Sequence, residues 1–340
     1  MSLATRRFIV YSEATMTTRR ALLGLCTLLG VTAWGCSDSS DELCAGSYLV
    51  VNPIAPVLEI EDEVATDANT GLMWAREERG DALVDGLGEF QPADSAHPQE
   101  AVARAAAYCT DLELGGYDDW RLPTRLELHS LVDHSHCGTD GGGPALDQQA
   151  FPTAHLGTFR TPYWTSTHHF AENEYAVGFL EGEISYDGDV GGQIAFARCV
   201  RSTCTRTAPA TPFDVAGGVV HDLRTGLEWE QQPQVLNVLD WSASPIIQPA
   251  LDYCAALGLD GGGFRLPNVK ELATIVDETR VQPVIDPTVF PDTQTEFYVT
   301  STPLGCSKPL GWYWAVQFGD GVVYPMDQSY TQTAYVRCVR

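Results

Sequence analysis

The amino-acid sequence predicts an α+β protein built of two tandem domains, each with short antiparallel strands and two helices. Two duplicated stretches lead to this prediction. Residues 121–128 (RLPTRLEL) return as residues 265–272 (RLPNVKEL), and a turn at residues 67–71 returns at residues 222–226. With 340 residues, of which 44% are hydrophobic, the chain is long enough for two ordinary cores.

Each copy of the RLP stretch is expected to begin a helix. Thr124 and Asn268 suit the N-cap position, and the proline before each of them fixes φ ahead of the helix. Glu127 and Glu271 follow three residues later, where a carboxylate can accept a hydrogen bond from the N-cap amide. The sequence therefore predicts two short helices, each with a capping box, at equivalent places.

The other predicted elements also occur in pairs. The Asp that begins and the Gly that ends residues 67–71 are typical of a hairpin turn. The Ala-rich residues 99–112 predict a helix, and its counterpart lies near residues 250–257. The later strand segments match in three pairs: residues 163–167 with 298–302, 176–179 with 315–318, and 198–201 with 337–340.

The charge of the chain excludes several kinds of partner. Twenty basic and 45 acidic residues give a formal net charge of −25. A surface this acidic repels nucleic acid, anionic lipid headgroups and sulfated polysaccharides at long range. We therefore expect no nucleic-acid partner and interpret the charge as a solvated acidic surface.

The N-terminus resembles a bacterial lipoprotein signal. Arg19 and Arg20 precede an apolar run at residues 21–34, which is too short to span a membrane. Cys36 follows a small residue and begins a polar tether, so we expect it to carry lipid and anchor the protein to a membrane. Ordinary cleaved secretion is the alternative, and the true start is Met1 or Met16.

Export follows from either reading of the leader. We expect a lipoprotein of the outer membrane or cell surface, on the periplasmic or extracellular face. The predicted divisions of the chain are a signal peptide at 1–35, a tether at 36–56, a first domain at 57–201, a linker at 202–212 and a second domain at 213–340.

Cysteines in an exported chain are expected to form disulfides. Cys109 and Cys199 recur as Cys254 and Cys338, so the simplest pairing joins the helix to the last strand within each domain. The partners of four others stay open, because Cys137 and Cys306 can pair with Cys204 and Cys44 or with each other: Cys44, Cys137, Cys204 and Cys306.

In the order of these motifs the chain resembles the Lcl C-terminal domain family, named after a domain of a bacterial collagen-like adhesin. The motifs are D-x-x-T-G-L-x-W at 67–74, Y-C at 108–109, W-R-L-P-T-x-x-E-L at 120–128, F-P at 151–152, Y-W-T-S-T at 163–167 and R-C-V-R at 198–201. They return in the second domain, with Asn268 in place of Thr and no Trp before Arg265.

This resemblance implies an exported, often lipid-anchored bacterial protein. The namesake domain is associated with adhesion and with sulfated glycans, a ligand that does not suit so acidic a chain. The RLPT and RCVR segments are also similar to formylglycine-generating enzymes and to wider C-type-lectin-like folds, which implies a C-type-lectin-like fold for both domains.

Two groups of residues are candidates for metal binding. His129, His134, His136 and Cys137 lie close together in the sequence, but the second domain has no equivalent cluster, so we favour surface histidines beside a disulfide. Residues 140–143 and the Asp187 to Asp189 turn could offer oxygen ligands to Ca²⁺, yet both lack the later carboxylate of a calcium loop. We therefore expect no cofactor, with Ca²⁺ as the alternative.

Aromatic side chains are the candidates for ligand binding, because their faces can stack on sugar rings. Trp164 and Trp312 are the two we single out, although an aromatic residue in a predicted strand can equally belong to the core. Cys199 and Cys204 have a spacing similar to the redox pair of formylglycine-generating enzymes, but a disulfide to Cys109 is the simpler interpretation.

The sequence thus predicts a non-catalytic surface or envelope lipoprotein that binds a glycan or protein ligand, for example in adhesion. It contains no G-x-S-x-G, P-loop or H-E-x-x-H motif, and we expect no catalytic residues. The alternatives are a structural envelope protein without a soluble ligand and, after it, a relative of formylglycine-generating oxidases.

Overall fold

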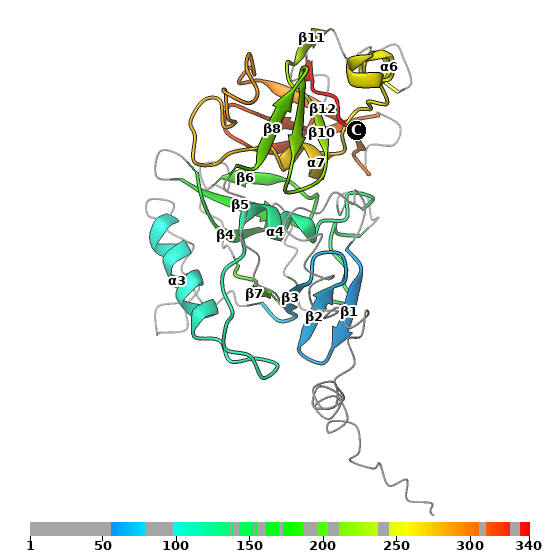
Figure 1. Ribbon diagram of the computed structural model, residues 1–340. Helices are drawn as coiled ribbons and strands as arrows, with labels where there is room; N and C mark the ends of the chain where they lie inside the picture. The colour runs from blue at the N-terminus through cyan, green and yellow to red at the C-terminus, as the bar shows by residue number, and fades with distance from the viewer. Residues whose placement is uncertain are drawn as a thin grey trace, which may run out of the picture. The chain divides into compact units, whose positions relative to one another are not determined.

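The structure is a computed structural model, and it describes residues 56–78, 98–136, 138, 143–152, 154, 161–169, 173–186, 196–202, 211–236, 245–305, 311–326 and 334–340. The described residues of both domains belong to one compact unit. As predicted, the fold is α+β, with mostly antiparallel sheets and few helices (Figure 1).

The strands of each domain begin with an N-terminal hairpin. In the first domain these strands are β1 (Leu58–Glu61), β2 (Val64–Asp67), β3 (Leu72–Ala75), β4 (Pro162–His168), β5 (Glu174–Gly178), β6 (Ile184–Tyr186) and β7 (Val200–Ser202). In the second they are β8 (Phe213–Ala216), β9 (Val219–Asp222), β10 (Glu228–Glu230), β11 (Gln234–Leu236), β12 (Phe297–Pro303), β13 (Tyr313–Gln317), β14 (Val323–Met326) and β15 (Ala334–Val336).

The predicted helices are present in both domains. They are α3 (Pro98–Thr110) and α4 (Arg125–Ser130) in the first domain, and α6 (Gln248–Ala256) and α7 (Val269–Ala273) in the second, where a short 3₁₀ turn, η4 (Leu259–Gly261), precedes α7. Both predicted capping boxes are formed at α4 and α7. The carboxylate of Glu127 accepts from the Thr124 amide at 2.8 Å and from the Arg121 guanidinium at 2.7 and 2.5 Å. Glu271 repeats this arrangement with Arg265.

In each domain the N-terminal and C-terminal segments are paired through the backbone, and a disulfide joins the last segment to a helix. In the first domain β3 pairs with β7, and in the second Trp229 forms a bridge to Val339. Cys109 in α3 is bonded to Cys199, and Cys254 in α6 is bonded to Cys338, as the duplication predicts. The other sequence candidates for pairing, together with Cys36, lie outside the described residues: Cys44, Cys137, Cys204 and Cys306.

A buried arginine from each R-C-V-R segment lies against the aromatic core. Arg198 lies over the Phe151 ring at 4.3 Å, donates to the carbonyl oxygen of Ala75 at 3.0 Å and pairs with the buried carboxylate of Glu78 at 2.8 Å. Arg337 occupies the same position in the second domain, where its side chain donates to the Thr293 hydroxyl. Burial lowers the pKa of Arg337 to about 10.

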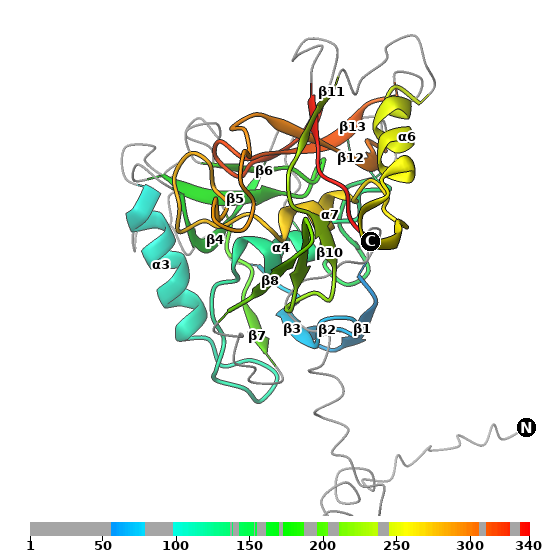
Figure 2. The ribbon, with the colours of Figure 1, turned by 45° about the horizontal axis from the view of Figure 1, so that its top comes forward.

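One sheet continues through both domains. Its order is β11-β15-β12-β13-β14-β6-β5-β4, and the junction is the antiparallel pairing of β14 with β6. The residues that face each other there, Ile184 and Val323, are equivalent positions of the two repeats. The helices α4 and α7 also pack against each other (Figure 2). The two domains therefore meet as the subunits of a two-fold dimer do, but within a single chain.

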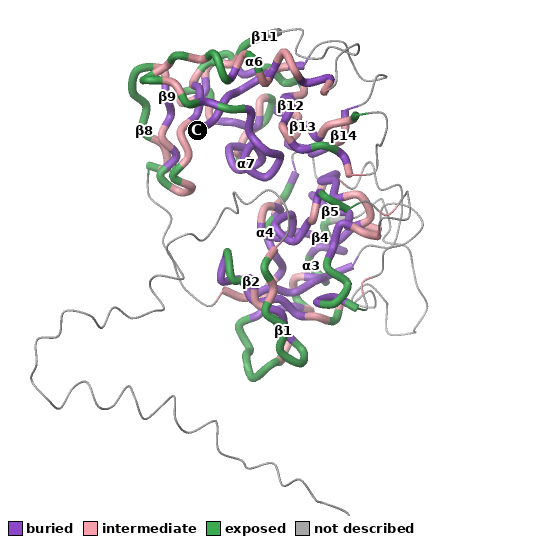
Figure 3. The backbone as a smooth tube through the Cα atoms, turned by 90° about the vertical axis from the view of Figure 1, so that its right-hand side faces the viewer, coloured by how far each residue is buried: buried purple, intermediate pink, exposed green. Residues whose placement is uncertain are grey.

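Polar contacts and a shared core hold this junction. Arg125 is fully buried and donates to the carbonyl oxygens of Gly321 at 3.1 Å and Ala273 at 3.3 Å, both in the second domain. In the other direction Lys270 donates to the Ser130 carbonyl oxygen at 3.0 Å. Buried residues of both domains form one continuous apolar cluster, and Figure 3 shows α4 and α7 as buried segments.

A glycine at the junction provides a test of this packing. Gly321 has φ of +77°, and a Cβ there would lie 2.6 Å from the hydroxyl oxygen of Tyr175 in the first domain. Gly226 has φ of +74° but nothing within 4 Å of its Cβ position. Gly226→Ala should cost about 1 kcal/mol of unfolding free energy from backbone strain alone. Gly321→Ala should cost about 3 kcal/mol, because the contact with Tyr175 is added.

Urea denaturation of the two variants measures the difference. An equal loss of stability in both would contradict the close contact between Gly321 and Tyr175.

Candidate functional site

A pocket recurs at the same place in both domains. In the second domain a pocket of about 460 Å³ is lined by Asp277 and Asp286, and in the first domain a pocket of about 550 Å³ is lined by Asp133 and Asp147. These aspartates are equivalent positions of the two repeats. Both volumes fall in the range of small-molecule sites.

Each aspartate is fixed by a local turn. Asp277 Oδ1 accepts from the amide of Thr279 at 3.1 Å and from its hydroxyl at 2.6 Å. Asp286 Oδ1 accepts from the amide of Thr288 at 2.9 Å and from its hydroxyl at 2.7 Å. An Asp followed two residues later by Thr favours this turn, which holds the carboxylate rigidly at the pocket.

A basic side chain bridges the aspartates in the second domain. Arg280 donates from Nε to Asp277 Oδ2 at 2.7 Å and from a terminal nitrogen to Asp286 Oδ2 at 2.9 Å. Burial opposes ionisation of Asp286, but the hydrogen bonds from Thr288 and the charge of Arg280 outweigh it and lower its pKa. In the first domain His136 takes the place of Arg280, with its Nδ1 2.8 Å from Asp133.

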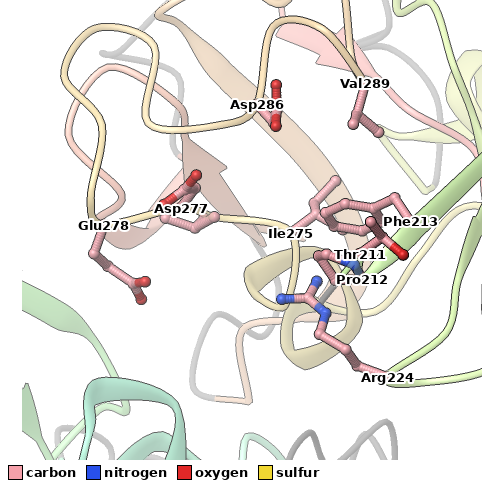
Figure 4. A pocket seen from close by; sticks show the side chains of 10 residues that line it. Thr211, Pro212, Phe213, Arg224, Ile275, Asp277, Glu278, Asp286 and Val289 are labelled. Atoms are coloured by element: carbon pink, nitrogen blue, oxygen red, sulfur yellow. The ribbon is translucent and has the colours of Figure 1, made fainter. Parts of the chain in front are cut away.

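The remaining wall differs between the pockets. In the second domain it contains Phe213, whose ring is covered at 4.6 Å by the Arg224 guanidinium. Arg224 is held by Asp222 at 3.0 Å. Figure 4 shows Phe213 and Arg224 on the side of the pocket away from Glu278. Repeat equivalence puts Leu58 at the position of Phe213, and of the residues described as lining the two pockets only Phe213, in the second, carries a phenyl ring.

The first domain contributes to the second pocket through one ion pair. Glu278 lines the pocket, and its Oε1 accepts from Nε of Arg125 in α4 at 2.8 Å. Because Arg125 is buried in the junction, the position of this pocket carboxylate depends on the contact between the domains.

The structure corrects the choice of aromatic ligand residues. Trp164 in β4 is only 2% exposed and belongs to the core beneath the disulfide of the first domain, so the prediction that it stacks on a ligand is wrong. Trp312 is half-buried and packs against the shared core. Neither residue is among those lining the two pockets.

The interpretation of the histidine cluster as surface residues is also wrong for two of its members. His129 and His134 are 1% and 2% exposed, because α4 and the loop after it face the second domain. His136 does lie at the surface, and Cys137 lies outside the described residues.

The candidates for calcium binding fall mostly outside the described structure, which includes Gly143 but not Asp187, Asp189 or residues 140–142. Across the described residues, no three His, Cys, Asp or Glu side chains are grouped closely enough to hold a metal ion. The helices in this part of the chain are all too short or too polar to cross a lipid bilayer.

Sequence reasoning missed the pockets, although a signal was present. Asp133 and Asp277 close the helical segments in both copies, and Asp147 and Asp286 recur in the loops that follow. A duplicated pair of Asp-containing turns indicates two rigid carboxylates per domain. Their closeness in space is visible only in the fold.

The fold and the paired pockets define a tandem-domain, disulfide-linked α+β protein with one acidic pocket in each domain. Within that class, the chain belongs to the Lcl C-terminal domain family, which it matches over residues 63–201 and again over 218–340. The predicted family is therefore confirmed for both repeats. No curated protein and no solved structure matched the chain.

The buried lysine at the junction gives a pH-dependent prediction. Burial lowers the pKa of Lys270 to about 8, with Asp67 and Asp133 opposing the shift. Since an unfolded lysine keeps its proton to about pH 10.4, folding releases protons above pH 8 and stability should rise with pH. The expected gain between pH 8 and 9 is about 1 kcal/mol.

Urea denaturation at both pH values measures this gain. Lys270→Met should be at least as stable as the native chain at pH 7 and should show no such rise. A rise that persists in Lys270→Met would assign the effect to another group.

Proposed function

We propose that this chain is an exported, lipid-anchored protein of the cell envelope whose domains bind a ligand without chemically changing it. The observation that supports this most directly is the recurrence of one pocket, built on the same pair of aspartate turns, in both domains. Duplicated pockets favour binding to a ligand that offers repeated groups, because two linked sites raise the overall affinity.

The proposal includes a C-type-lectin-like fold for each domain. It is supported by the pairing of N- and C-terminal segments and by the disulfide that joins the first helix to the last strand segment. A shared fold does not identify the ligand, so we infer the class of ligand from the side chains of the pocket.

The chemistry of the second pocket favours an uncharged or basic glycan, with a protein ligand as the alternative. Oδ2 of Asp277 and Oδ2 of Asp286 each accept from Arg280, and a carboxylate oxygen can accept two hydrogen bonds, so both can also accept from a sugar hydroxyl. Phe213 offers an aromatic surface on the other wall. Sulfated ligands are disfavoured by these carboxylates and by the net charge of −25.

Ligand binding is tested with a matched pair of aromatic variants on the full mature chain. Glycan-array hits are followed by calorimetry on the native protein, on Phe213→Ala and on Tyr117→Ala. Both rings have an arginine stacked on them, at 4.6 Å for Phe213 and 3.7 Å for Tyr117, but of the two only Phe213 is among the residues described as lining the acidic pockets. Phe213→Ala should raise the dissociation constant about tenfold, which corresponds to about 1.4 kcal/mol.

Tyr117→Ala should bind like the native chain. An equal rise of the dissociation constant in both variants would indicate that the ligand binds outside the pocket. No binding to any glycan or envelope protein would favour the structural envelope alternative. The oxidase alternative requires Cys199 as a free thiol, whereas this residue is bonded to Cys109.

The proposed location has its own test. Cys36→Ser should move the protein from the membrane fraction to the soluble fraction, because the lipid on Cys36 is the proposed anchor. Fractionation and the mass of the N-terminal peptide measure this. An unmodified Cys36 in the native protein would overturn the anchor and leave cleaved secretion.

A further inference from the structure

Two buried histidines face each other at the junction of the domains. Nε2 of His134 lies 3.1 Å from Nε2 of His129, and the two rings are nearly edge to face. His134 also meets the edge of Trp314, which β13 contributes from the second domain, with 4.9 Å between ring centroids. The backbone of Gly305, also in the second domain, lies close to the carbonyl oxygen of His134. This histidine is therefore enclosed by the other domain.

The permanently charged groups that shift the pKa of these histidines are cations. Lys270 of α7 and Arg125 of α4 both disfavour a charge on His129, and Lys270 also disfavours one on His134. Three carboxylates of the region interact with these cations instead. Asp67 and Asp133 favour the charge on Lys270, and Glu278 forms an ion pair with Arg125. The turn at Gly182 also contains Glu181 and the buried Glu183, but neither is among the groups that shift the pKa of either histidine, and the ring of Trp314 brings no charge.

Only the neutral pair fits this environment. With one proton on each imidazole, one Nε2 can donate to the other across the 3.1 Å separation. A first further proton can go to Nδ1 of the donating ring and leave this hydrogen bond in place, but it adds a buried cation beside Lys270, and a second one would also place two N–H groups face to face. Burial, followed by these positive neighbours, accordingly holds the pKa of both histidines well below its ordinary value.

The opposite half of the junction has different chemistry. The position equivalent to His134 is Glu278, and the position equivalent to His129 is Ala273. Glu278 holds Arg125 in an ion pair, while Tyr175 donates to the Asp320 carbonyl oxygen beside it. The two halves of the junction therefore differ in their titratable groups, with a pair of imidazoles in one and an Arg–Glu ion pair in the other.

We propose that the His129–His134 pair is an acid-sensitive switch in the contact between the two domains. Protonation loosens the packing of α4 and its following loop against α7 and Trp314, so that water reaches the imidazole rings. The Arg125–Glu278 half remains as a hinge, and the domains stay joined.

The direction of the pH effect follows from proton binding. The open form, with solvated rings, binds protons near the ordinary histidine pKa of about 6.5, whereas the closed form resists them. The closed form is favoured above about pH 6.5, and this preference is lost as the pH falls. For each proton taken up on opening, the population of the open form should rise about tenfold per pH unit.

Hydrogen exchange of the full mature chain, followed by mass spectrometry from pH 7.5 to 4.5 and corrected for intrinsic exchange rates, tests the switch. Peptides from α4, α7 and the β6–β14 junction should lose protection as the pH falls below about 6.5. Peptides from the β1–β2 and β8–β9 hairpins should keep theirs, because those strands belong to other sheets than β6 and β14.

Matched variants identify the group that titrates. The double variant His129→Gln/His134→Gln keeps hydrogen-bonding side chains that cannot take up a proton, so its junction should remain protected in acid. His136→Gln changes an exposed histidine of the same segment and should behave like the native chain.

Three results would overturn the proposal. The first is that α4 and α7 stay protected against hydrogen exchange down to pH 4.5. The second is that the double glutamine variant loses this protection to the same extent as the native chain. The third is that protection is lost at the same pH across the whole chain. If the double variant does not fold, NMR titration of the native histidines decides. Protonation of both buried rings without loss of protection at the junction would also refute the switch.

Discussion

The contact between the two domains is the constraint on which most of the structure depends. Pairing of Ile184 with Val323 joins three strands of the first domain and five of the second into one sheet, and a single apolar cluster includes Trp74 from the first domain and Trp314 from the second. Without this contact β6 and β14 would both be open sheet edges, and a buried guanidinium, that of Arg125, would lose its partners. Each domain therefore completes the folded surface of the other.

Duplication within one chain lets the two halves of the contact differ. A homodimer must place identical residues on both sides of its axis, whereas here the position of His134 is Glu278 in the other repeat. The pockets have diverged in the same way, with Phe213 in one and Leu58 at the matching place in the other. One half has an ion pair between Arg125 and Glu278, and the other has two buried histidines.

The distribution of charge connects the fold to the kind of ligand that suits it. Four basic side chains are buried and donate hydrogen bonds to backbone carbonyls or internal carboxylates. They are Arg125, Arg198, Lys270 and Arg337. Seven acidic side chains are buried as well, and the residues that remain at the surface keep a large excess of acidic groups. Such a surface repels sulfated and phosphorylated molecules at long range, which is consistent with the uncharged or basic ligand that we propose.

The sequence by itself determined the features that depend on near neighbours or on the repeat. The capping boxes at Thr124 and Asn268 involve contacts within three residues, and the disulfides followed because both cysteines of each pair recur. Tertiary structure alone decided that Trp164 is buried and that His129 meets His134 against the second domain. A strand or helix pattern tells which face is apolar, but what covers that face depends on residues far away in the chain.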